Sequence, residues 1–378
     1  MIDTIAINIY QHDFTITDHN RFSPNTLNLF EPPYIKVRGS SIFNAKNNPS
    51  KSDIAEHGYL PRITCYKAIR KGGFKIWIKV EFSIPKLLYG NNFREVEGID
   101  FEQICSKLKM AMFHMGVMIR DVDVLKNAEV SSIHYSKNII LTDYTTPSVY
   151  IKEIMKCNIN MFQDVNQTDY RNGGYSFKYR SNNFEVIWYD KIKDLEQSKK
   201  SEKRCIENDN YIQQNMFDVF KEKRPFEVLR LEVRLGNQKK IKQIISKLNL
   251  ERQTLDFQTL FSKSISQKVL LSIVKKTEEN YISILRDGSD SFKGMLTNLQ
   301  INNPHLNYSQ ALKYIGAKAL MDEIGIREFR EATSRFGNSQ WYRLKKWLEK
   351  VNIDKEIDVF KKIRADIEKF EMVKLDLS

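Results

Sequence analysis

The sequence predicts an α+β protein, in which a ferredoxin-like antiparallel sheet packs against helices and an all-helical region follows. Apolar and polar residues alternate in several segments of the first two-thirds of the chain, as they do in half-buried strands. A Gly-Gly pair separates two of these segments, which is typical of a β-hairpin. Helical spacing prevails from about residue 238 onward. We therefore expect an α+β domain at residues 1–240 and a helical domain at residues 241–378.

The first half of the sheet follows from three alternating segments. Residues 4–10 (TIAINIY) place three isoleucines on one face of a strand. Residues 62–69 (RITCYKAI) and 74–84 (FKIWIKVEFSI) flank the glycine pair as the two arms of a hairpin. Pro85 then withdraws a backbone donor and residues 90–92 (GNN) favour a turn, so we expect the chain to leave the sheet there.

A helix and two further strands are expected next. Residues 100–119 (DFEQICSKLKMAMFHMGVMI) carry apolar residues at helical spacing, and Gly116 stands where a helix C-cap would lie. The segments 117–125 and 128–141 predict another pair of strands. This order favours helices packed on one face of an antiparallel sheet.

A second cycle of the same kind follows. We expect a helix at 148–162, strands at 174–180 and 184–190, a charged helical region at 191–222 and a strand at 226–236. Arg230, Glu232 and Arg234 share one face of that last strand. The residues expected among apolar neighbours are Val228, Leu231, Val233 and Leu235. Three aligned charges on a strand predict either a functional site or a solvated edge.

The C-terminal region contains a candidate DNA-binding unit. Residues 308–351 predict three short helices, broken at Gly325 and at 336–338, with Ser339 as the N-cap of the last one. That helix turns Trp341, Leu344 and Leu348 inward and carries Arg343, Lys345 and Lys346 on its surface. The arrangement is that of a helix-turn-helix, and an ordinary solvated helix hairpin is the alternative.

Composition narrows the class of partner. Lys and Arg number 60 against 47 Asp and Glu, which gives a net charge of +13 and favours an extended anion such as nucleic acid. A basic protein without such a partner is the alternative. No apolar run approaches the roughly 18 residues of a membrane span, so we expect a soluble, cytoplasmic protein. The four cysteines are too far apart for a zinc knuckle and are expected to be reduced and buried.

Two segments resemble a known family. Residues 80–92 (VEFSIPKLLYGNN) and the helix after them resemble the N-terminal domain of phage and plasmid replication initiators of the II/X family, which are filamentous-phage gene II-like proteins of the rolling-circle HUH superfamily. Residues 173–195 (GGYSFKYRSNNFEVIWYDKIKDL) and 228–235 (VLRLEVRL) resemble the second half of that domain. The resemblance covers islands within residues 1–240. It implies a nicking endonuclease whose tyrosine becomes joined to a DNA 5′ phosphate.

That chemistry needs a divalent cation, which the resemblance implies to be Mg²⁺ or Mn²⁺. The sequence has no His-x-His pair, the usual metal motif of this superfamily. His134 and Glu232, from neighbouring central strands, are the candidate metal ligands. The alternatives are a hydrogen-bonded structural histidine and an in-face ion-pair network between Glu232 and its flanking arginines.

Three tyrosines are candidates for the nucleophile. In the superfamily's usual order the tyrosine lies on a helix after the metal strands, which points to Tyr281 and to Tyr314, whose neighbour Lys318 lies one turn away. Either residue could instead be a core aromatic of an amphipathic helix. Tyr189 is the third candidate, although its strand position and the adjacent Lys191 fit phosphate positioning better than attack.

The expected partner is single-stranded or origin DNA. The charge run 191–204 predicts either a DNA-contacting arm or a solvated helix. The candidate DNA contacts are Lys191, Lys193, Arg230, Arg234, Arg343, Lys345 and Lys346. We expect initiation of rolling-circle replication by site-specific nicking, and the alternative is a non-catalytic origin-binding protein that retains the fold. Formation of a homodimer is left open.

Overall fold

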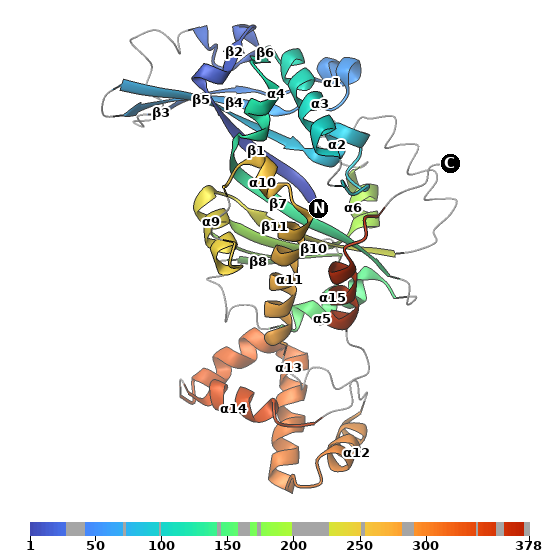
Figure 1. Ribbon diagram of the computed structural model, residues 1–378. Helices are drawn as coiled ribbons and strands as arrows, with labels where there is room; N and C mark the ends of the chain where they lie inside the picture. Colours follow the sequence, from blue (N-terminus) through green and yellow to red (C-terminus); the bar gives the residue numbers. More distant parts are fainter. Residues whose placement is uncertain are drawn as a thin grey trace.

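The computed structural model describes residues 1–27, 42–70, 73–97, 100–141, 145–157, 167–171, 175–198, 227–250, 254–281, 291–337, 339–352 and 359–373. The strands are β1 (Ile2–Tyr10), β2 (Phe14–Ile16), β3 (Ile42–Asn47), β4 (Arg62–Arg70), β5 (Gly73–Ser83), β6 (Val117–Ile119), β7 (Glu129–Leu141), β8 (Gln167–Arg171), β9 (Ser176–Ser181), β10 (Phe184–Asp190) and β11 (Glu227–Leu235). Figure 1 shows them beside the helices and confirms the predicted α+β class.

The helices are α1 (Lys51–His57), α2 (Ile84–Tyr89), α3 (Phe101–His114), α4 (Val122–Lys126), α5 (Pro147–Met155), α6 (Lys191–Ser198), α9 (Gln238–Lys247), α10 (Phe257–Leu260), α11 (Lys263–Glu279), α12 (Phe292–Asn302), α13 (Tyr308–Ser334), α14 (Gln340–Leu348) and α15 (Val359–Lys369). Helices α5 and α6 and strands β9, β10 and β11 confirm the described part of the second predicted cycle, whereas residues 158–162 and 199–222 of its predicted helices lie outside the described residues. The strand expected at 117–125 is shorter, because its second half forms α4 and its first half pairs with β2 in a separate two-stranded sheet.

One nine-stranded sheet of order β3-β4-β5-β1-β7-β11-β10-β9-β8 forms the centre of the fold. Every strand pair in it is antiparallel. The order contains two equivalent halves, β1-β5-β4-β3 and β7-β11-β10-β9, which meet at β1 and β7. In each half the first strand pairs with the last one, and helices follow that last strand. The two predicted cycles are therefore two topological copies around the β1–β7 pair.

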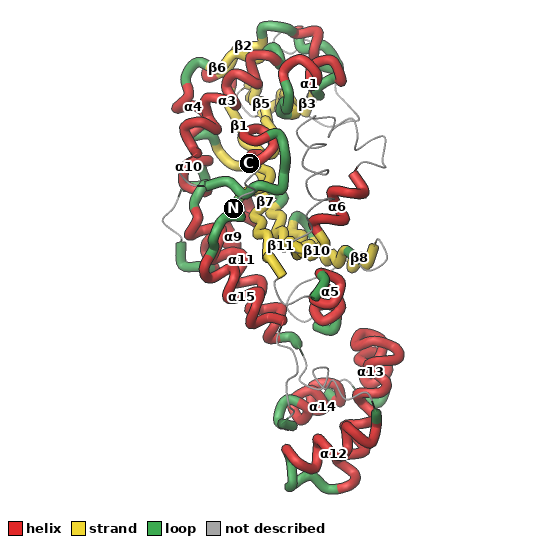
Figure 2. Tube along the Cα trace, turned by 90° about the vertical axis from the view of Figure 1, so that its right-hand side faces the viewer, coloured by secondary structure: helices red, strands yellow, loops and turns green. Residues whose placement is uncertain are grey.

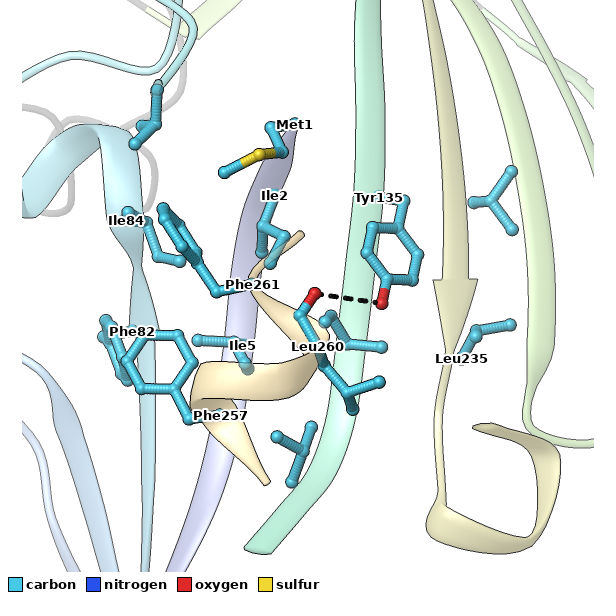
Figure 3. Close-up of a cluster of buried hydrophobic side chains, with 14 of the residues drawn as sticks. Met1, Ile2, Ile5, Phe82, Ile84, Tyr135, Leu235, Phe257, Leu260 and Phe261 are labelled. Atoms are coloured by element: carbon cyan, nitrogen blue, oxygen red, sulfur yellow. Dashed lines mark hydrogen bonds between the residues drawn. The ribbon is translucent and has the colours of Figure 1, made fainter. Parts of the chain in front are cut away.

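Helices cover one face of this sheet because the strands direct their apolar side chains to it. Figure 3 shows part of this core, in which Phe257, Leu260 and Phe261 of the α10 segment pack between β1, β5 and β7. The Tyr135 hydroxyl donates a 3.4 Å hydrogen bond to the Leu260 carbonyl there. Figure 2 shows α3, α9, α11 and α15 along this side of the sheet and α6 on the other side. We call the covered side the apolar face.

The opposite side, which we call the polar face, carries the alternate residues of the same strands. His134 and Ser136 of β7 point to it, and so do Glu232 of β11 and Tyr189 of β10. Val228 also lies on this side, because it is two residues from Arg230 and a strand repeats every two residues. It packs against Leu195, Phe93 and Val373 in a small separate cluster under α6, so the expectation of apolar neighbours is confirmed, although these neighbours form a cluster apart from the main core.

The exit from β5 combines a short helix with a glycine turn. Pro85 lies in the first turn of α2, where its missing N–H is not needed. Leu87 and Leu88 are buried in the main core. Gly90 then ends α2 in the left-handed region at φ 72°, a conformation that favours glycine. The Asn91 side chain accepts hydrogen bonds from the next backbone amides, and the chain proceeds to α3.

A second core lies in the C-terminal helices α12, α13 and α14 (Figure 1). Its buried members are Leu299, Ala311, Tyr314, Ala317, Met321, Ile326, Phe329, Trp341, Leu344, Leu348 and Val351. Helices α9, α10, α11 and α15 belong instead to the main core. The expected domain boundary at residue 240 therefore does not coincide with the change of core, which comes after α11, and the chain returns to the main core at α15.

The helix breaks predicted in this region are partly confirmed. Gly325 interrupts α13 with φ 79° and ψ 157°, so the helix is kinked there. Helix α14 begins after Ser339, but the Ser339 side chain makes no capping hydrogen bond. Trp341, Leu344 and Leu348 are buried, which confirms the predicted inward stripe.

Candidate functional site on the polar face

Glu232 and His134 lie side by side on the polar face. They project from β11 and β7, which are neighbouring strands, and Arg234 is the residue directly opposite His134 in the register. The His134 Nδ1 atom lies 3.5 Å from Glu232 Oε1. The two candidate metal ligands therefore share a face and lie within the roughly 4–5 Å that two ligands of one metal ion require.

The Glu232 carboxylate is almost enclosed by donors. Arg234 Nε donates a 2.8 Å hydrogen bond to Oε1, and the Tyr189 hydroxyl donates a longer one of 3.4 Å to Oε2. Only 3% of the Glu232 side chain is exposed. Burial by itself would raise its pKa, but the positive charge of Arg234 and the contact with His134 hold the pKa well below its usual value. The carboxylate is therefore ionised at neutral pH.

Alternating charges extend this contact along the sheet. Arg234 also donates a 2.8 Å hydrogen bond to Glu185 on β10, which is paired with Lys178 on β9. Arg230, two residues before Glu232 on β11, donates hydrogen bonds of 2.6 Å to Asp3 and 2.9 Å to Ser136. Each buried charge thus has an opposite charge or a polar partner, which buried ions require.

A divalent cation does not fit this donor set. A metal ion on Glu232 Oε1 would share that oxygen with the Arg234 guanidinium, and Mg²⁺ or Mn²⁺ needs several oxygen ligands in octahedral geometry. Within the described ranges, no group of three or more His, Cys, Asp or Glu side chains could hold a metal ion. His134 and Glu232 instead belong to the in-face network that the sequence left open as an alternative.

Tyr189 is the predicted nucleophile that the fold brings to Glu232. Its neighbours include Arg230, which is its partner in the β10–β11 register. Burial raises the Tyr189 pKa well above its usual value, although the positive charge of Arg230 opposes the shift. The phenol is therefore protonated at neutral pH, which makes it a weak nucleophile in this arrangement.

The other two candidate nucleophiles lie elsewhere. The Tyr281 hydroxyl donates a hydrogen bond to Glu153 of α5, and its ring packs edge-on against Phe360 of α15, on the apolar side of the sheet. Tyr314 is fully buried in the second core. Tyr314 is a core aromatic of the helix α13, whereas Tyr281 is half-buried just beyond the end of α11 at Glu279, which corrects the expectation drawn from chain order. Lys318, expected to act on Tyr314, forms an ion pair with Asp322.

Two residues predicted to contact DNA are buried, so that prediction is wrong for them. The Lys191 side chain is fully buried and lies 3.4 Å from Asp194, and Arg230 is enclosed by Asp3 and Ser136. Both cations therefore lie inside the protein, where a DNA strand cannot reach them. The Lys193 ammonium lies over the Tyr175 ring at 3.1 Å from its centroid.

Other predicted contacts are reachable from solvent. The Arg234 side chain is 37% exposed and lines a cavity of about 520 Å³ together with His134 and the turn between β9 and β10. On α14, Arg343 and Lys346 are exposed, whereas Lys345 is paired with Glu349. The remaining residues of the predicted charge run, 199–204, lie outside the described residues.

Sequence reasoning missed a larger cavity on the first half of the polar face. It has a volume of about 710 Å³ and lies beside β1, β4 and β5. Its charged lining consists of Lys46, Arg62, Lys79, Lys86 and Glu81. The alternation that predicted β4 and β5 also places their polar residues on one face of the sheet. That shared face is the sequence signal from which a charged surface could have been predicted here.

Comparison with known proteins does not identify a family. Searches against family models, curated proteins and solved structures gave no match to this chain. A separate search of the described helices found none that is long and apolar enough to cross a membrane.

Proposed function

We propose that the protein binds DNA as a single strand laid across the polar face of the sheet, in the manner of a non-catalytic origin-binding replication protein. The observation that carries the proposal is the polar face itself, on which two cavities with cationic lining lie on the two halves of one sheet. Thr4 lines the larger cavity and is the register partner of His134, which lines the smaller one. The two cavities therefore meet at the β1–β7 pair.

Charge and aromatic side chains on this face suit a nucleic acid strand. Lysines and arginines bind phosphates by releasing counterions, and the net charge of +13 favours such a partner. Tyr66 and Trp77 are stacked on neighbouring strands with ring centroids 5.1 Å apart and 12° between their planes. Stacked aromatic residues on a sheet offer the flat surfaces on which unpaired bases pack. The Lys75 ammonium lies close by, over the Tyr10 ring.

The role in replication rests on the resemblance of residues 80–92 and 173–195 to replication initiators of the II/X family. Within that role, the enclosure of Glu232 by Arg234 and Tyr189 favours binding over catalysis. Each carboxylate oxygen already accepts a hydrogen bond from the protein, and the phenol of Tyr189 is protonated. Both groups are held for structure and charge balance.

A binding assay tests this proposal. Fluorescence anisotropy of a labelled single-stranded oligonucleotide should give a dissociation constant that rises steeply with salt. A double variant, Lys75→Ala with Arg180→Ala, removes one exposed cation from each half of the polar face. We expect the slope of log K against log salt to fall by about 1 to 2 in magnitude, as for the loss of two phosphate contacts.

The matched control removes two exposed lysines from the apolar side. Lys239→Ala with Lys242→Ala changes the net charge by the same amount on α9, which packs on the covered face. If both double variants weaken binding equally, the effect is one of net charge and the polar face is not the binding surface. Absence of binding by the unaltered protein would also reject the proposal.

A second candidate function is favoured by the contact between Tyr189 and Glu232. In a nicking reaction the Tyr189 oxygen would attack a DNA phosphorus atom, lose its proton to the carboxylate and release the 3′ oxygen of the broken bond. Incubation with supercoiled origin plasmid in buffer containing Mn²⁺ tests it. Nicked circles with protein on the 5′ end, absent for Tyr189→Phe, would replace the binding role with an enzymatic one.

A further inference from the structure

The larger cavity on the polar face has the character of an anion site, and we propose that it binds a phosphate monoester. The ligand is the 5′-phosphorylated end of a DNA strand or a free nucleotide, which carry the same phosphate group. This inference deepens the proposed function and rests on it for the DNA end. The cavity itself is defined by its own residues, so a nucleotide tests it separately.

Comparison of the two halves of the sheet explains why the cavity is open. Strands β5 and β11 flank the central β1–β7 pair, and each carries a basic and an acidic residue, two positions apart, on the polar face. These residues are Lys79 and Glu81 on β5 and Arg230 and Glu232 on β11. In the second half, Arg234 lies two residues further along and closes on Glu232. Ser83 holds that place on β5. The smaller side chain leaves room beside Glu81, and the cavity occupies it.

The charges of the lining favour an anion. Lys46, Arg62, Lys79 and Lys86 face a single lining carboxylate, that of Glu81. The Glu81 side chain is 44% exposed and lies 3.8 Å from the Lys79 ammonium. Burial lowers the Lys86 pKa and Arg62 adds to the shift, although the negative charges of Asp3 and Asp194 oppose it. A bound anion would oppose this shift, because it stabilises the charged form of the lysine.

The polar groups of the cavity include a donor that needs an acceptor. The Ser83 hydroxyl is buried and has no hydrogen-bond partner in the part of the chain that the structure describes. The backbone N–H of Ser83 is already used, because it donates a 2.7 Å hydrogen bond to the Tyr59 hydroxyl. Buried hydroxyls are nearly always paired, so the Ser83 hydroxyl is available to donate to a ligand or water oxygen in the cavity. A phosphate oxygen is a strong acceptor for it.

The size and the aromatic wall of the cavity fit a nucleotide. Its volume of about 710 Å³ lies within the range of roughly 300–1,000 Å³ typical of small-molecule sites. Tyr66 lines the cavity and is stacked on Trp77, so a base can pack beside the phosphate. A monoester carries nearly two negative charges at neutral pH, against one for a phosphodiester. The excess of cations therefore favours a terminal phosphate over an internal one.

Paired oligonucleotides provide the test. Anisotropy should show that a 5′-phosphorylated single strand binds about tenfold more tightly than the same strand with a 5′ hydroxyl, as for one charge-assisted hydrogen bond. Arg62→Ala should abolish this preference, whereas Arg62→Lys should retain part of it. Arg62 is exposed, so its replacement leaves the fold intact, which circular dichroism checks. Lys242→Ala on α9 is the control and should keep the full preference.

A second arm uses a free deoxynucleoside monophosphate, measured by isothermal titration calorimetry. Binding that is lost in Arg62→Ala, without a 5′-phosphate preference, would identify the free nucleotide as the ligand. Equal affinity for both oligonucleotides together with no nucleotide binding would overturn the inference and leave DNA binding by the polar face standing. Nucleotide binding with no oligonucleotide binding would reject the proposed DNA-binding function and would retain the cavity as a phosphate site.

Discussion

The ammonium of Lys137 donates a 2.6 Å hydrogen bond to the carboxylate of Glu95, and both side chains are buried, with 2% and 4% exposed. Glu95 also accepts hydrogen bonds from the backbone N–H groups of Asn138 and Val373. One carboxylate therefore joins the segment after α2, the end of β7 and the C-terminal segment after α15. Positive charge and hydrogen bonds hold its pKa below the usual value in spite of burial.

Loss of this carboxylate should destabilise the fold strongly. Glu95→Ala leaves the Lys137 charge and two backbone donors buried without a partner, and we expect the free energy of unfolding to fall by about 3–5 kcal/mol. Urea denaturation measures the change. Lys126→Ala is the control, because its partners Glu102 and Asp123 are about 70% exposed, so the loss should be far smaller than that of Glu95→Ala. Similar losses in the two variants would contradict the structural role of Glu95.

The buried Lys191 should make stability depend on pH. Burial lowers its pKa from 10.5 to about 8. Between these values the unfolded chain binds more protons at this lysine than the folded one, so stability rises with pH across that window. In Lys191→Met this contribution is absent. The wild-type free energy of unfolding, taken relative to the variant, should rise by up to about 1.4 kcal/mol per pH unit between pH 8 and 10. A flat difference would show that the lysine is hydrated in the folded protein.

Replacement of Glu232 distinguishes a structural role of its carboxylate from a catalytic one. Glu232→Ala removes the acceptor of the 2.8 Å hydrogen bond from Arg234 Nε, and we expect a loss of about 2–3 kcal/mol in the free energy of unfolding. DNA affinity at fixed salt should change by less than about threefold, since lysines and arginines supply most of it. Denaturation and anisotropy on one preparation give both values. A plasmid-nicking activity that Glu232→Ala abolishes would instead assign the carboxylate to chemistry.

Two glycines of α13 should respond in opposite directions. Gly325 has φ 79° and ψ 157°, a conformation close to one reserved for glycine, so Gly325→Ala should destabilise the second core by about 1–3 kcal/mol. Gly316 is exposed in a regular part of the same helix, and a Cβ there meets no atom within 4 Å. Gly316→Ala should stabilise by about 0.5–1 kcal/mol. Thermal unfolding distinguishes them, and stabilisation by both changes would mean that α13 is straight.

The face of each strand could be predicted from the sequence because a strand repeats every two residues. Arg230, Glu232 and Arg234 do share one side of β11, and the isoleucines of β1 do lie in the core. The same rule, applied strictly, puts Val228 with the arginines, where the structure has it. Local signals also located the hairpin of β4 and β5, the kink at Gly325 and the buried stripe of α14.

Contacts between distant segments could not be predicted in this way, because a periodic pattern fixes the face of a strand and leaves its neighbours undetermined. The pairing of β10 with β11 brings the Tyr189 hydroxyl to Glu232, while the apolar stripe of α13 takes Tyr314 into the second core and Tyr281 packs against Phe360 beyond the end of α11. Pairing of Arg230 with Asp3 needs β11 and the N-terminal strand in one sheet. The sequence by itself determined which residues are polar on each element, through local stereochemistry. Only tertiary packing decided which of those charges neutralise one another and which remain around a cavity.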